Sequence, residues 1–147
     1  MSTELPPEAY AAALAAFPHM SIHRLGALLR HHPPREAYSV ATGEQRSVGL
    51  IERVLADCDV RAAWQRAGRS ALLGDMWERC SRLGVRVLLH GAPDYPIQLL
   101  DDLLPPPVVF AQGDLGLLDG RRAAIIGTPQ CHRGRTRHRV HPGPAAG

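Results

Sequence analysis

The residues best placed for chemistry follow an apolar run near residue 125. Residues 123–126 read Ala-Ala-Ile-Ile and lead directly into Gly127 and Thr128. A run that is apolar throughout is typical of a buried parallel strand. Glycine then lets the backbone approach a ligand closely, and the threonine hydroxyl lies beside free backbone N–H groups. The sequence therefore predicts either a ligand-binding turn at Gly127 and Thr128 or a strand that simply ends there.

Two arginines precede this run. Arg121 and Arg122 could contact a phosphate backbone, or they could form a solvated pair at the start of a strand. The chain contains no lysine and no asparagine and is rich in alanine, glycine, proline and arginine. This composition is typical of a GC-rich genome, so arginine by itself is a weak indicator of phosphate binding here.

Side chains that can bind metals gather after residue 130, at Cys131, His132, His138 and His141. A zinc site needs four ligands at suitable spacing on a folded scaffold. The spacing here fits no such site. The sequence therefore predicts neither a metal nor a cofactor.

Composition and charge exclude several classes of protein. The 147 residues are 45% hydrophobic and 21% charged, which is typical of a chain that folds. All 14 acidic residues and 13 of the 17 arginines precede residue 123, so this part is close to neutral and lacks the basic excess of a duplex-binding domain. No membrane span and no secretory signal are visible, which favours a cytoplasmic protein.

The elements that would position these residues fall into two groups. Apolar periodicity predicts helices over residues 8–17, 22–29, 34–40, 47–56 and, as one helix or two, 59–82. Ser21 is expected to cap the second helix and Gly84 to end the last one. The core residues expected in the last helical segment are Trp64, Leu72, Leu73, Met76, Trp77 and Leu83. Strands are expected at 85–89, 108–113 and 121–128. The expected fold class is α+β, with a helical domain at 1–84 followed by opening strands at 85–128.

Residues 94–128 resemble the DNA-processing protein A family, also called Smf. The matching series is Tyr95-Pro96 with Leu99 and Leu103, then residues 105–110, then Gly113 and Leu115, and finally residues 121–128. The ordered series is more specific than any one of its members. Residues 10–29 also resemble a degenerate helix-hairpin-helix (SAM-like) module, with His19-Met20-Ser21 at the place of the glycine-containing hairpin.

The resemblance implies a function in natural transformation and recombination. The family binds incoming single-stranded DNA and loads the RecA recombinase; it is not an enzyme, and it forms homodimers through a Rossmann-like domain. By this resemblance Gly127, Thr128, Arg121 and Arg122 would be DNA-binding residues. The family normally has arginine directly after Gly-Thr, whereas this chain has Pro129.

A single inserted base accounts for that departure. Residues 129–132, Pro-Gln-Cys-His, can be encoded as CCG CAA TGC CAC. Removing the first base gives Arg-Asn-Ala-Thr, which restores the family pattern. We therefore expect residues 129–147 to be a disordered, out-of-frame tail, and the chain to be an inactive fragment without the family's dimer surface.

Two other functions stay open at this stage. The Gly-Thr strand also opens nucleotide-binding Rossmann-like enzymes, but the Pro-Gly-Gly-x-Gly-Thr motif and the glutamate of their phosphoribohydrolase members are missing. Alternatively, residues 1–84 form a helical module that binds a protein partner.

Overall fold

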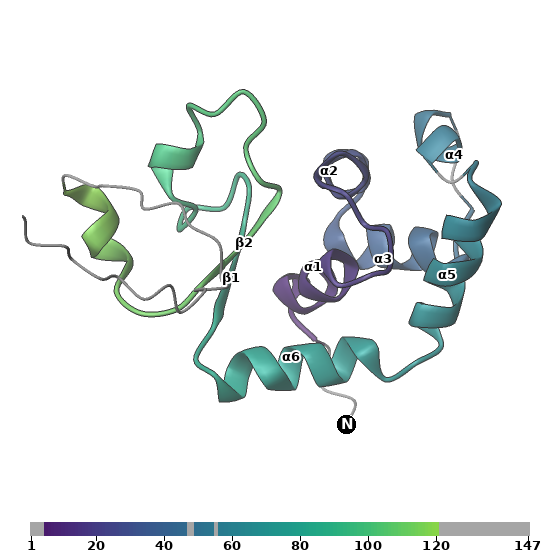
Figure 1. Cartoon of the computed structure of the whole chain (residues 1–147), viewed down its shortest axis with the longest axis horizontal. Coiled ribbons are helices and arrows are strands. Elements are labelled where there is room, and N and C mark those ends of the chain that lie inside the picture. Colours follow the sequence, from purple (N-terminus) through teal and green to yellow (C-terminus); the bar gives the residue numbers. More distant parts are fainter. Residues whose placement is uncertain (1–4, 47–48, 55, 121–147) are drawn as a thin grey trace, which may run out of the picture.

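Helix α1 (Pro7–Ala15) lies at the centre of the computed structural model, which describes residues 5–46, 49–54 and 56–120 (Figure 1). Its buried residues are Ala9, Ala11, Ala12, Ala13 and Leu14, each with no exposed surface. A helix that is apolar on all sides is one enclosed by its neighbours. The small alanine side chains allow α3, α6 and both strands to pack directly against α1.

In the described part of the chain five further helices follow α1. They are α2 (Ile22–His31), α3 (Pro34–Thr42), α4 (Leu50–Val54), α5 (Cys58–Gly68) and α6 (Leu72–Arg82). The predicted cap of the second helix is confirmed, because Ser21 Oγ accepts a hydrogen bond from the Arg24 N–H at 3.2 Å. The predicted segment 59–82 is two helices, and α3 extends two residues beyond the predicted 34–40.

Aromatic side chains join the helices into one core. Phe17 contacts Tyr38 with ring centroids 5.6 Å apart and Trp64 with centroids 6.2 Å apart. Trp64 is fully buried, as the sequence predicted. Its indole N–H donates to the carbonyl oxygen of Pro18 at 2.8 Å. This bond ties α5 to the turn between α1 and α2.

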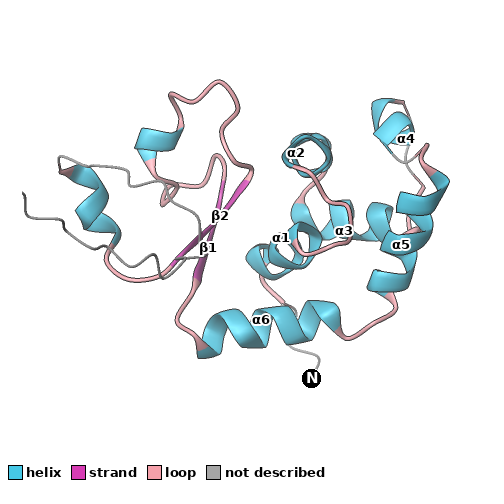
Figure 2. Cartoon of the chain, viewed as in Figure 1, coloured by secondary structure: helices cyan, strands magenta, loops and turns pink. Residues whose placement is uncertain are grey.

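The strands β1 (Arg86–Leu89) and β2 (Val108–Ala111) form an antiparallel pair on one side of α1 (Figure 2). Arg86 pairs with Ala111 and Leu89 with Val108. Short 3-10 helices precede and follow β2, at Ile97–Leu99 and Leu115–Asp119. A second cluster of buried side chains, Ala12, Cys80 and Val87, joins α1, α6 and β1. The described chain is thus a mixed α+β structure.

One predicted core residue is wrong. Leu83 is 48% exposed, because it occupies the C-cap of α6, where the chain turns away from the helical core. The turn is completed at Gly84, which has a φ of 63° and confirms the predicted helix end. Within the described residues we find no helix with the length and apolar character needed to cross a bilayer.

Candidate functional site

The four predicted DNA-contacting residues, Arg121, Arg122, Gly127 and Thr128, lie outside the described residues. The same holds for the predicted strand at 121–128 and for the cysteine and histidines after residue 130. The described part of the family-like series is residues 94–120. Within the described residues no three His, Cys, Asp or Glu side chains come together as a group that could hold a metal.

Tyr95 anchors the segment that leads into β2. Its side chain is buried, and its hydroxyl donates to the carbonyl oxygen of Pro106 at 2.8 Å. The N–H of His90 donates to the carbonyl oxygen of Pro107 at 3.0 Å, and the rings of His90 and Tyr95 lie edge to face at 5.3 Å. The Tyr-Pro pair and the proline run are therefore one hydrogen-bonded unit that places β2 beside β1.

This unit makes stability sensitive to alkaline pH. Burial, and after it the negative charge of Asp102, raises the pKa of the Tyr95 hydroxyl above its ordinary value. Tyr95 therefore contributes fully to the free energy of unfolding below pH 10.0, the ordinary pKa of tyrosine. Above that pH the contribution is lost, because the tyrosine of the unfolded chain releases its proton at a lower pH than that of the folded chain.

Tyr95→Phe is expected to lower the free energy of unfolding at pH 7 by about 1 kcal/mol, the net contribution of one hydrogen bond. It should also reduce the loss of stability above pH 10.0. Part of that loss should remain, because burial raises the pKa of Tyr38 as well. Urea unfolding at pH 7 and above pH 10.0 measures both effects; an unchanged pH dependence would contradict this role of Tyr95.

The turn between α1 and α2 contains one residue in a backbone conformation that favours glycine. His19 has a φ of 57°, the left-handed region that favours glycine. The Arg24 guanidinium donates to the His19 carbonyl oxygen at 2.7 Å and lies 3.8 Å from the Asp57 carboxylate. Arg24 is therefore already paired within the fold.

His19→Gly is expected to raise the free energy of unfolding by about 0.5–1 kcal/mol, because it relieves the left-handed strain on a residue with a Cβ. His23→Gly is the matched control: the same substitution at an exposed position inside α2 should lower the free energy by about 0.5–1 kcal/mol. Thermal unfolding of both variants gives the comparison. Equal destabilisation by the two would contradict the left-handed conformation of His19.

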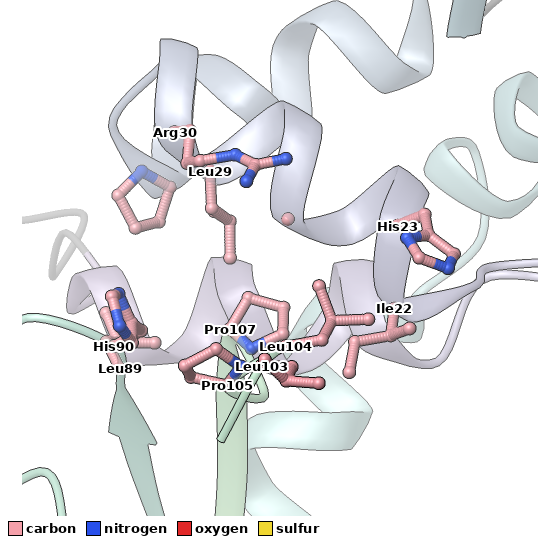
Figure 3. Close-up of a pocket in the computed structure, with 12 residues that line it drawn as sticks. Ile22, His23, Leu29, Arg30, Leu89, His90, Leu103, Leu104, Pro105 and Pro107 are labelled. Carbon is pink, nitrogen blue, oxygen red and sulfur yellow. The ribbon is translucent and has the colours of Figure 1, made fainter. Parts of the chain in front are cut away.

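A cavity that the sequence did not predict lies between α2 and the proline run (Figure 3). Its volume is about 250 Å³. Its lining comes from α2, the start of α3, the end of β1 and residues 103–107. In Figure 3, Leu29 points from α2 toward Pro107, while His90 closes one end. These segments are distant in the sequence, so no local pattern indicates the cavity in advance.

No protein-family model, no curated protein and no solved structure matches the chain.

Proposed function

We propose that the chain is part of a DNA-processing protein of the Smf type, which binds single-stranded DNA and passes it to the RecA recombinase. The observation that carries the proposal is the ordered series of residues from Tyr95 to Thr128 in the sequence. The hydrogen bond from the Tyr95 hydroxyl to the Pro106 carbonyl oxygen supports it, because it links the Tyr-Pro pair and the proline run, two separate members of this series.

The same proposal assigns two modules to the chain. The helices α1 and α2, with the left-handed His19 between them, would form a degenerate helix-hairpin-helix module. Residues 85–128 would open a Rossmann-like domain. Arg24 is paired with Asp57 within the fold, so we expect the DNA contacts elsewhere than at this hairpin.

Residues 129–147 would be an out-of-frame reading of the family's next segment. The codons available for Pro-Gln-Cys-His permit Arg-Asn-Ala-Thr one base away, so the test is to sequence the locus. The proposal expects that a single-base change restores a long Rossmann-like reading frame. A locus in which no single-base change does so would refute it.

The binding site itself is tested on the frame-restored protein with fluorescent single-stranded oligonucleotides. Arg121→Ala with Arg122→Ala should weaken binding and reduce the slope of log affinity against log salt by about 1.4, since each phosphate contact contributes about 0.7. Thr128→Val should weaken binding at every salt concentration by removal of its hydroxyl.

Arg61→Ala with Arg69→Ala is the matched control, since it removes the same charge from two exposed positions, one on α5 and one just after it. It should leave the salt slope within about 0.3 of the unsubstituted value, well below the contribution of one contact. An equal effect of the two arginine pairs would mean that binding follows net charge alone, contrary to the proposed site.

A further inference from the structure

The cavity between α2 and the proline run opens to the surface and combines apolar walls with one arginine, Arg30. Leucine and proline side chains of residues 29, 89, 103–105 and 107 form most of its wall. Three nitrogen-bearing side chains, those of His23, Arg30 and His90, also line it (Figure 3). No described carboxylate faces it. A ligand that matches this wall has an apolar body and a negative group.

Arg30 is the side chain best placed to meet that negative group. Its Nη2 atom and the Cγ atom of Pro107 each lie 4.0 Å from the point where a Cβ on Gly26 would stand. The guanidinium thus lies beside Gly26 on α2. The ion pairs found among the described residues involve Arg24, His32 and Arg86, not Arg30. A guanidinium in this position can bind a carboxylate through two parallel hydrogen bonds.

Size limits the apolar body. An apolar cavity of about 150 Å³ in another protein holds benzene. At about 250 Å³, this cavity has room for a ring with a short chain. We propose that it is a binding site for a small free aryl carboxylate, with the ring against the leucines and prolines and the carboxylate on Arg30.

Gly26 places no side chain in the cavity. A methyl group there would be in ordinary van der Waals contact with both Arg30 and Pro107, and a longer side chain would enter the space itself. Glycine is unfavourable inside a helix. Glycine at this position therefore lowers the stability of α2 but leaves the cavity free of a side chain.

The test is a two-dimensional NMR titration of the full chain with 3-phenylpropionate. We expect saturable shifts of the amide signals of Gly26, Leu29, His90 and Leu104. Arg30→Gln should weaken binding at least 10-fold, and Gly26→Leu should abolish it. Arg69→Gln removes an exposed arginine that does not line the cavity and should leave the affinity unchanged. Because Arg30 is exposed, Arg30→Gln tests the site even where Gly26→Leu perturbs folding.

Two further probes separate the chemistry of the ligand. The neutral 3-phenylpropionamide should bind at least 10-fold more weakly than the carboxylate; equal binding would overturn the role assigned to Arg30. The peptide acetyl-Gly-Gly-Phe carries the same ring and carboxylate at a protein C-terminus. Binding of this peptide 10-fold tighter than 3-phenylpropionate would overturn the assignment to a small free ligand, and an absence of saturable shifts with every probe would overturn the site.

Discussion

Replacing Trp64 by alanine is expected to lower the free energy of unfolding by about 3–5 kcal/mol. The side chain has no exposed surface and packs against Phe17, so its removal leaves a large cavity in the aromatic core. It also leaves the Pro18 carbonyl oxygen without its donor, 46 residues away along the chain. Urea unfolding followed by far-ultraviolet circular dichroism measures the loss.

Two variants separate the packing of Trp64 from its hydrogen bond. Trp64→Phe keeps an aromatic ring but removes the N–H donor, and should cost about 1–3 kcal/mol. Trp77→Ala is the control, because Trp77 is only partly buried beside the second cluster and should cost less than Trp64→Ala. A larger loss from Trp77→Ala would contradict the central place of Trp64.

Gly68→Ala is expected to lower the free energy of unfolding by about 1–3 kcal/mol, the usual cost of overpacking. A Cβ at Gly68 would stand 2.2 Å from Cγ2 and 2.7 Å from Cβ of Thr42, where the end of α5 crosses the end of α3. Helix propensity alone favours alanine by up to about 1 kcal/mol, so the sign of the change decides between the two effects. Thermal unfolding of purified variants gives that sign.

Gly74→Ala provides the matched control, since Gly74 lies inside α6 with nothing within 4 Å of its added Cβ. It should raise the free energy of unfolding by up to about 1 kcal/mol. In a Thr42→Gly background the nearest remaining atom is Cα of Thr42 at 3.6 Å, so Gly68→Ala should lose most of its cost there. Stabilisation by Gly68→Ala in the original chain would rule out the close crossing of α3 and α5.

Local signals in the sequence predicted most of the helices and both described strands. Ser21 before an amphipathic run and Gly84 after one have local physical effects, and both act as predicted. The sequence also placed Trp64 in the core, where it is fully buried. These predictions succeed because capping and burial depend on a few neighbouring residues.

The contacts between distant segments could not be predicted in this way. The crossing of Gly68 with Thr42 and the bond from Trp64 to Pro18 depend on how helices pack, which no local pattern encodes. Gly26 and Pro107 both line the cavity beside α2, although they lie far apart in the sequence and only folding brings them together. The exposure of Leu83 has a local cause instead, because its apolar type fits the core while its place at a helix end does not.

The proposed DNA function is tested most directly by fluorescence anisotropy with single-stranded oligonucleotides of increasing length, at low and moderate salt. The chain as printed is compared with the frame-restored protein. We predict length-dependent binding at moderate salt by the restored protein and its loss in the printed chain, whose four arginines after residue 130 would support only salt-sensitive binding. Comparable binding by both proteins at moderate salt, or no binding by the restored protein, would contradict the account.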